Sequence, residues 1–296
     1  MNTPNAGKRN QDLLPTIFPL RPAGGEGSVF FLPDLGGNTF YAKNLVFQLE
    51  PGRGAYGMRL DSELLENLPG CTLQGLAQRF AADLHASAFA EPFHLVGHSF
   101  AGILAFETAR HLVMLGAEVG TLALLDCGLP SRFYSGWYYR AVGAVVEAVR
   151  EFKIRQHDLL KKAVFGHPAD DPSVILSVPG FVRMDLTKHP ESYRHIIRHL
   201  YRAMVDYEPG PYAGHLTLFR SMNRGFAAAP ADLGWGPYAR GCVDVIRITG
   251  DHLDMVRDDR AAMAVAERLD RILSAAEHRG QKTQSATEIA ATAGLT

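Results

Sequence analysis

The sequence has few cysteines and no long apolar run. Its three cysteines, Cys71, Cys127 and Cys242, are scattered over 296 residues, without the spacing of disulfide frameworks, zinc sites or redox motifs. No stretch has the length of a membrane-spanning helix, and the polar segment 1–12 lacks the apolar core of a signal peptide. We therefore expect a protein of the reducing cytoplasm that enters no membrane and holds no metal.

A surplus of charge is also missing. The formal net charge is -1, so the chain lacks the basic excess with which proteins bind nucleic acid or anionic membranes. Hydrophobic residues make up 47% of the chain, which is ample for the core of one large α/β domain or of two small ones. Composition therefore favours an enzyme or a binding protein for small molecules or other proteins.

The most informative segment spans residues 93–102 and reads FHLVGHSFAG. It places Ser99 between an apolar strand pattern and a helix, with Gly97 two residues before it and Ala101 two residues after it. Small residues at these positions let a strand and a helix pass closely and expose the serine as a nucleophile, as in α/β-hydrolases. Because most α/β-hydrolases have glycine where Ala101 stands, we expect the methyl group of Ala101 to lie in a tight space. The alternative is a purely structural strand–helix turn.

Two further residues complete a catalytic pattern in chain order. Asp126 follows the apolar run 121–125, and His252 follows the strand pattern 243–249 and the turn Gly250-Asp251. Both positions lie at the carboxyl ends of predicted parallel strands, where active sites of open α/β sheets assemble. The order Ser, Asp, His is that of α/β-hydrolases. Asp251 and Asp254 remain alternatives to Asp126 as the acid.

Strand and helix patterns alternate along most of the chain. This alternation predicts an α/β-hydrolase fold, with a mostly parallel sheet flanked by helices and a helical lid insertion. Strands are expected at 28–32, 54–60, 121–125, 215–220 and 243–249, and helices at 39–49, 73–89, 138–162, 191–207 and 261–275. We divide the chain into a linker or amino-terminal extension (1–27), a single domain (28–275) with its lid at about 131–207, and a disordered tail (276–296).

Beyond the elbow and the triad, the residues resemble the chain-terminating thioesterases of polyketide synthases and non-ribosomal peptide synthetases. The resemblance covers about residues 17–272. Its motifs are Leu32-Pro33-Asp34-Leu35-Gly36-Gly37 after the first of the predicted strands, Gly97-His98-Ser99-Phe100-Ala101-Gly102, Leu124-Leu125-Asp126, Tyr207-Glu208-Pro209, Leu218-Phe219-Arg220, Leu233-Gly234-Trp235 and Gly250-Asp251-His252. Leu32 stands where the family often has histidine, which leaves the triad intact.

The resemblance implies a mechanism. His252 takes the proton of Ser99 while Asp126 orients the imidazole, and Ser99 attacks an acyl group on the phosphopantetheine arm of a carrier protein. The backbone N–H groups of Asp34 and Phe100 are expected to form the oxyanion hole. Water or an internal nucleophile of the acyl chain then releases an acid or a macrocycle. No cofactor is expected, because the substrate arrives as a phosphopantetheine thioester.

The predicted lid is expected to contribute to substrate binding. Between residues 131 and 165, seven Lys or Arg stand against three acids, which fits an acidic carrier protein or an ordinary solvated helix face. Leu35 outside the lid and Phe133, Tyr134, Trp137 and Tyr138 within it are candidates for an acyl channel, although such aromatics also fill cores. The pair His195 and His199 has helical spacing but no third metal ligand nearby.

Three functional hypotheses follow. The first is the carrier-dependent serine thioesterase, acting by hydrolysis or macrocyclisation. The second is a free-standing carboxylesterase on soluble esters, and the third is a non-catalytic binding protein on a hydrolase scaffold. Since relatives of the resembled type include dimers, a homodimer is an open alternative to a monomer.

Overall fold

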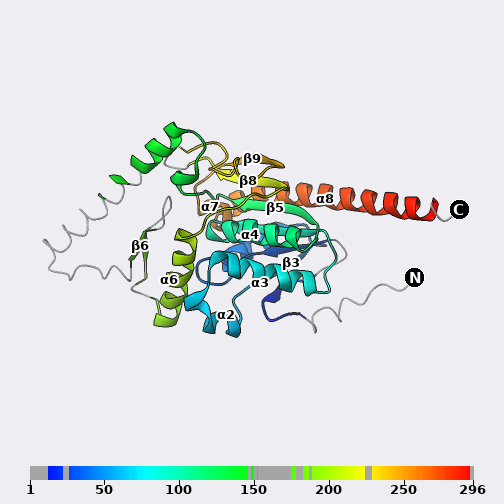
Figure 1. Cartoon of the computed structure of the whole chain (residues 1–296), viewed down its shortest axis with the longest axis horizontal. Helices are drawn as coiled ribbons and strands as arrows, with labels where there is room; N and C mark the ends of the chain where they lie inside the picture. Colours follow the sequence, from blue (N-terminus) through cyan, green and yellow to red (C-terminus); the bar gives the residue numbers. More distant parts are fainter. Residues whose placement is uncertain are drawn as a thin grey trace.

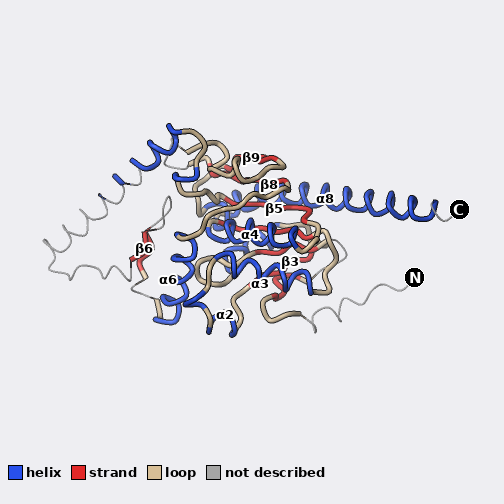
Figure 2. The backbone as a smooth tube through the Cα atoms, in the orientation of Figure 1, coloured by secondary structure: helices blue, strands red, loops and turns tan. Residues whose placement is uncertain are grey.

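The computed structural model of the chain describes residues 13–22, 27–145, 148–149, 152, 175–177, 183–186, 189–223 and 229–293. A seven-stranded sheet runs through the molecule in the order β1-β3-β2-β4-β5-β8-β9 (Figure 2). The edge strand β1 is antiparallel to β3, and the other pairs are parallel. The strands are β1 (Ile17–Arg21), β2 (Ser28–Phe31), β3 (Gly54–Met58), β4 (Phe93–His98), β5 (Val119–Leu125), β8 (His215–Ser221) and β9 (Cys242–Ile248).

Helices cover both faces of this sheet, as Figure 1 shows for α3 and α4 on one side. The helices and 3-10 turns are η1 (Phe40–Ala42), α1 (Lys43–Gln48), α2 (Ser62–Glu66), η2 (Leu68–Gly70), α3 (Leu73–Ala86), α4 (Phe100–Met114), η3 (Ser131–Phe133), α6 (Glu191–Val205), α7 (Asp254–Arg257) and α8 (Asp259–Ala293). The α/β-hydrolase fold expected from the alternation of patterns is therefore confirmed.

The alternation of side chains along the strands divides the core into two layers. Leu95 packs in the layer that includes α3 and α4, whereas the next residue, Val96, packs in the layer that includes α1, α7 and α8. Because both faces are buried, the central strands read as continuous apolar runs. The helix α4 lies between α3 and the sheet, which explains why nearly all its side chains are apolar.

Two of the predicted boundaries differ from the structure. The segment 17–21, which we placed in the linker or extension, forms β1 and pairs with β3. The tail expected to be disordered from residue 276 instead continues α8 as a helix through Ala293, and Figure 1 shows the end of α8 projecting from the body. Local composition could not show the pairing of β1, because it depends on a strand elsewhere in the chain.

The lid is described only in part. The helix α6 (Glu191–Val205) matches the predicted segment 191–207, and residues 137–145 are helical as expected within 138–162. A short antiparallel hairpin of β6 (Ile175–Ser177) and β7 (Arg183–Asp185) was not predicted. Of the seven basic residues in the predicted surplus, only Arg132 and Arg140 lie in the part of the chain that the structure describes.

Candidate active site

Ser99 occupies the sharp turn between β4 and α4. Its backbone has φ 55° and ψ -123°, a conformation that costs a residue with a side chain on the order of 1–3 kcal/mol. The turn is held by the hydrogen bond from Ser99 N–H to the carbonyl of Leu125, at 3.0 Å. At Gly97, a Cβ atom would lie 2.1 Å from the carbonyl oxygen of Ala101, so only glycine fits there. The local geometry is that of the predicted nucleophile elbow.

The tight space on the helix side of the elbow lies at Gly102 rather than at Ala101. A Cβ atom on Gly102 would come within 2.5 Å of the Cβ of Cys127, which follows β5. Ala101 is fully buried, and its methyl group packs among the core side chains of α3 and α4. The close contacts at the elbow thus involve Gly97 and Gly102, whereas the methyl group of Ala101 belongs to the core layer that includes α3 and α4.

Asp126 and His252 meet at the carboxyl edge of the sheet. The Asp126 side chain is fully buried, and its Oδ2 lies 2.9 Å from His252 Nδ1. The Ser221 N–H donates to Oδ1 and the Ser221 hydroxyl to Oδ2, both at 2.9 Å. Since an ionised carboxylate only accepts hydrogen bonds, His252 Nδ1 carries the proton and Nε2 is an acceptor. This arrangement gives His252 the tautomer that a general base for Ser99 requires.

Two residues that sequence reasoning missed support this pair. Ser221 ends β8, which lies beside β5 in the sheet. Its position at the end of a predicted strand was the only feature of the sequence that could have indicated its role. His98 lies directly before Ser99, and its Nε2 donates to the carbonyl of His252 at 2.8 Å. The two imidazole rings lie 4.5 Å apart. Burial, with a smaller effect of His252, lowers the pKa of His98 to about 3, so that it stays neutral.

The loop after β2 folds against α6. The Asp34 N–H, expected to contribute to an oxyanion hole, donates to the carbonyl of Asn38 at 2.8 Å, so the loop itself uses it. The Phe100 N–H begins α4 and has no acceptor within that helix. A Cβ atom on Gly36 would lie 2.5 Å from the Tyr193 hydroxyl, and Gly37 has φ 75°. Both glycines therefore allow the loop to fit closely against its neighbours.

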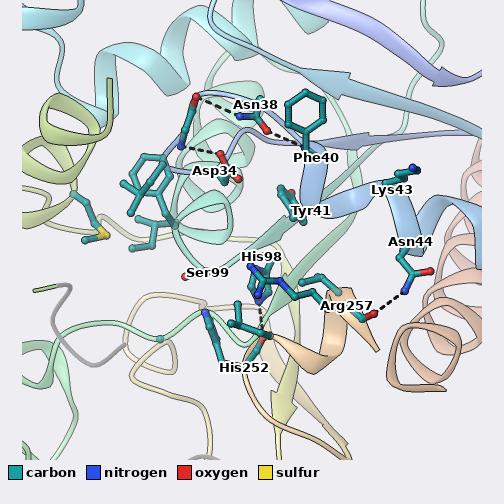
Figure 3. A pocket seen from close by; sticks show the side chains of 18 of the residues that line it. Asp34, Asn38, Phe40, Tyr41, Lys43, Asn44, His98, Ser99, His252 and Arg257 are labelled. Atoms are coloured by element: carbon teal, nitrogen blue, oxygen red, sulfur yellow. Dashed lines mark hydrogen bonds between the residues drawn. The ribbon is translucent and has the colours of Figure 1, made fainter. Parts of the chain in front are cut away.

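A cavity of about 800 Å³ brings these groups together. Ser99, His252, Phe100 and the loop residues Asp34 and Leu35 all line it, and Figure 3 shows His252 and Ser99 on its lower side. Its other walls combine apolar and polar residues from the loop after β2, η1, α1, the β4–α4 elbow, the segment after β5, α6, α7 and the start of α8. They are Gly36, Asn38, Phe40, Tyr41, Lys43, Asn44, Phe47, His98, Ile103, Gly128, Pro130, Arg132, Tyr193, Met204, Val205, Leu253, Val256, Arg257 and Asp259.

Of the predicted channel residues, the structure places only Leu35 on this cavity. Phe133 packs edge-on against Tyr238, and Tyr134 lies against Gly234. Trp137 is 75% exposed and Tyr138 56% exposed on the helix that leads away from the site. Their assignment to the channel is corrected accordingly. The Phe and Tyr rings that do line the cavity come from η1, α1, α4 and α6, which meet only through the tertiary fold.

The Leu233-Gly234-Trp235 motif supports the strand end that carries Asp126. Trp235 is fully buried, and its indole N–H donates to the carbonyl of Cys127 at 2.8 Å. Leu129 N–H donates to the carbonyl of Leu233 at 3.0 Å. The motif thus holds the segment after β5 in place behind the candidate site.

Among the described residues, His215, Cys242 and Asp244 have ligand atoms within 4.8 Å of one another. His, Cys and Asp are ligand types that zinc accepts. These exposed side chains lie at the amino-terminal end of β8 and β9, opposite the elbow. The rings of His195 and His199 lie 4.4 Å apart on α6, and no third ligand joins them within the described residues.

No helix in the described part of the chain is long and apolar enough to cross a membrane.

The fold and this edge of the sheet define the class of protein: an α/β-hydrolase-fold protein whose elbow serine lines a cavity together with a histidine that pairs with a buried aspartate. Comparison with known proteins shows which families the chain is similar to. The family model of the thioesterase domain matches residues 43–165. The malpibaldin synthetase of Mortierella alpina is 24% identical over 264 residues, which is 87% of this chain and 4% of that protein.

Solved thioesterase domains have the same fold. The NocB thioesterase domain from the nocardicin cluster aligns with a TM-score of 0.56 at 19% identity, over 88% of this chain and 99% of that one. The Vlm2 thioesterase domain aligns with a TM-score of 0.55 at 22% identity, over 86% of this chain and 96% of that one. The chain spans 4% to 8% of the length of the curated relatives it matches. The predicted resemblance to the thioesterases of polyketide synthases and non-ribosomal peptide synthetases is confirmed.

Proposed function

We propose that this chain is a serine thioesterase that releases a polyketide or peptide acyl chain from the phosphopantetheine arm of a carrier protein. The observation that carries the proposal is the 2.9 Å contact between His252 Nδ1 and buried Asp126, in the cavity that also contains Ser99 on its elbow. The matches to thioesterase domains support the same reaction class.

In the first half of the reaction, Ser99 Oγ attacks the thioester carbonyl carbon while His252 Nε2 takes the hydroxyl proton. Asp126 holds the imidazole in its tautomer and stabilises the imidazolium that forms. When the tetrahedral intermediate collapses, the carbon–sulfur bond breaks and His252 returns the proton to the departing pantetheine thiolate. The product of this half-reaction is an acyl-Ser99 ester and a free carrier thiol.

In the second half, His252 removes a proton from water or from a hydroxyl or amine of the acyl chain itself. The resulting nucleophile attacks the ester carbonyl, and His252 then protonates Ser99 Oγ as it leaves. Water gives a free acid, and an internal nucleophile gives a macrocycle. Both routes use the same groups of the protein and require no cofactor.

We assign the oxyanion hole to the N–H groups of Phe100 and Leu35. Phe100 N–H begins α4, beside the nucleophile, where the positive end of the helix dipole also lies. The Asp34 N–H is engaged by the carbonyl of Asn38, and Leu35 is the next residue of the same loop on the cavity wall. Each such donor contributes about 3 kcal/mol to the stability of the transition state.

Replacing Ser99 by alanine tests the proposal. We expect Ser99→Ala to lose labelling by a fluorophosphonate probe and turnover of acyl-pantetheine thioesters, because loss of a triad serine costs on the order of 10⁶ in kcat. Labelling is measured by intact-protein mass spectrometry, with the exposed Ser62→Ala as a matched control that keeps both signals. Undiminished turnover in Ser99→Ala would exclude the acyl-enzyme mechanism.

The same assay separates the alternatives. A carrier-dependent thioesterase cleaves acyl groups on a carrier protein with a higher kcat/KM than small soluble esters, whereas a free-standing esterase does the reverse. A non-catalytic binding protein reacts with neither and is not labelled at Ser99. Mass spectrometry of products from acyl chains with and without an internal hydroxyl or amine distinguishes hydrolysis from ring closure.

A further inference from the structure

One carboxylate on the wall of the cavity has no role in the mechanism above. Asp34 lines the cavity together with Ser99 and His252, on the loop after β2 (Figure 3). Its Oδ1 accepts a hydrogen bond from Gly36 N–H at 2.8 Å. No described Lys, Arg or His side chain forms an ion pair with it. Asp34 is therefore an acid on the wall of the substrate space, and within the described residues no cation pairs with it.

The charge of Asp34 affects two phenols. Burial, and to a smaller extent the charge of Asp34, raises the pKa of both Tyr41 and Tyr193. The Tyr41 hydroxyl donates to the carbonyl of Leu32 at 2.8 Å, so it is engaged elsewhere. Burial raises the pKa of Asp34 itself to about 6, against the opposing effect of the Gly36 and Asn38 N–H groups.

The cations that line the cavity lie on other elements. Lys43 is on α1 and Arg257 on α7, and Arg132 follows β5 and donates to the carbonyl of Val205 at 2.8 Å. None of the three contributes to the pKa of Asp34. A buried carboxylate without a partner is costly, and an incoming cation that pairs with it removes part of that cost.

We propose that Asp34 binds an ammonium group on the acyl chain, so that the chain is selected for a primary or secondary amine within reach of the thioester carbonyl. This inference rests on the proposed function, because the amine is placed relative to the acyl group that Ser99 attacks. It names the class of substrate for which the cavity is suited: amino-acyl or amine-bearing chains rather than purely aliphatic ones.

A simpler role for Asp34 is to stabilise its own loop through the bond to Gly36. Two substitutions separate the roles. Asp34→Asn keeps an oxygen acceptor for Gly36 N–H and the size of the side chain but removes the charge. Asp34→Ala removes both. If the charge selects the substrate, Asp34→Asn already loses the preference, and if only the loop bond matters, only Asp34→Ala is affected.

The experiment compares pairs of acyl-pantetheine thioesters of equal length that end in an ammonium or a methyl group. For the wild-type chain we expect kcat/KM to favour the ammonium member by about tenfold or more at one chain length, as for a hydrogen bond to a charged group. In Asp34→Asn the ratio should fall to about one. The matched control is Asp259→Asn, which alters an exposed acid on the same cavity that accepts from Asn44 Nδ2 at 3.1 Å, and it should keep the wild-type ratio.

Each outcome either supports or overturns the inference. Equal kcat/KM for both members of every pair in the wild type, or an unchanged ratio in Asp34→Asn, overturns it. An equal fall in Asp34→Asn and Asp259→Asn also overturns it, since the effect is then general electrostatic attraction. Fluorophosphonate labelling of Ser99 is measured on the same samples: a labelled enzyme without amine preference refutes only this inference, and an unlabelled wild type refutes the proposed function.

Discussion

At the scale of single residues, the candidate site depends on one buried carboxylate. Asp126 accepts hydrogen bonds from Ser221 and from His252, and a buried anion requires such donors to remain ionised. Its own backbone has φ 44°, which turns the side chain back toward β8. The imidazole of His252 is thus fixed on one side by Asp126 and on the other by the contact of its backbone with His98.

His98 is expected to position His252. Its N–H donates to the backbone carbonyl of His252, and loss of that bond costs about 1.5 kcal/mol, or roughly tenfold in rate if the loop shifts. We therefore expect His98→Leu to lower the rate of fluorophosphonate labelling about tenfold. His98→Gln offers an amide N–H in place of the imidazole N–H and should restore most of the rate. Equal rates in the two variants would contradict a positioning role.

At the scale of elements, the crossing of β4 and α4 sets the shape of the elbow. Three small residues lie where β4 and α4 cross, but only two of these positions lack room for a Cβ atom. Gly97 faces the backbone of Ala101, and Gly102 faces Cys127. The methyl group of Ala101 fills a core position instead.

If the methyl group of Ala101 were strained, replacing Ala101 by glycine would stabilise the protein. We expect the opposite. Ala101→Gly removes a buried methyl group and places glycine in a helix, so we expect a loss of about 1–2 kcal/mol of stability. Gly102→Ala should destabilise by about 1–3 kcal/mol, because the new Cβ would lie 2.5 Å from that of Cys127. Denaturant midpoints measure both. A more stable Ala101→Gly variant would mean that the methyl group is strained after all.

At the scale of the whole molecule, a buried cation joins the sheet to the long helix α8. Arg53, fully buried before β3, donates to Asp270 at 3.0 Å, to Ser274 at 3.1 Å and to Glu277 at 2.5 Å. His94 on β4 has its Nε2 3.9 Å from Glu277 Oε1. These pairs connect α8 to the sheet up to Glu277, just past the predicted boundary at residue 276.

The stability of the molecule should fall in mild acid through His94. Burial, with a smaller effect of Arg53, lowers its pKa to about 4, against 6.5 in the unfolded chain. The unfolded state therefore binds more protons below about pH 6.5, and folding loses about 2 kcal/mol from this group between pH 7 and pH 5. His94→Gln should lose less stability than the wild type over this range. Urea midpoints at both pH values measure the difference, and parallel losses in the two proteins would contradict it.

Much of the fold and the core of the site could be predicted from the sequence. The predicted strands at 28–32, 54–60 and 243–249 match β2, β3 and β9 to within two residues at each end, because apolar runs between turn residues specify a strand locally. Ser99 and Asp126 were found because each directly follows a strand, and His252 because it follows a strand and a short turn. The edge strand β1 and the cavity walls were not predicted, since each depends on a partner far away in the chain.

Most of the central strands and helices, and three residues at the carboxyl edge of the sheet, could be predicted from sequence patterns alone. Hydrophobic periodicity and turn residues are local properties, so they require no knowledge of distant contacts. The hydrogen bond of His98 to the carbonyl of His252, 154 residues further on, and that of the Asp34 N–H to the Asn38 carbonyl became visible only in the folded chain. The tertiary structure also placed the carboxylate of Asp34 on the cavity wall, because burial and hydrogen-bond partners arise from segments that meet only when the chain is folded.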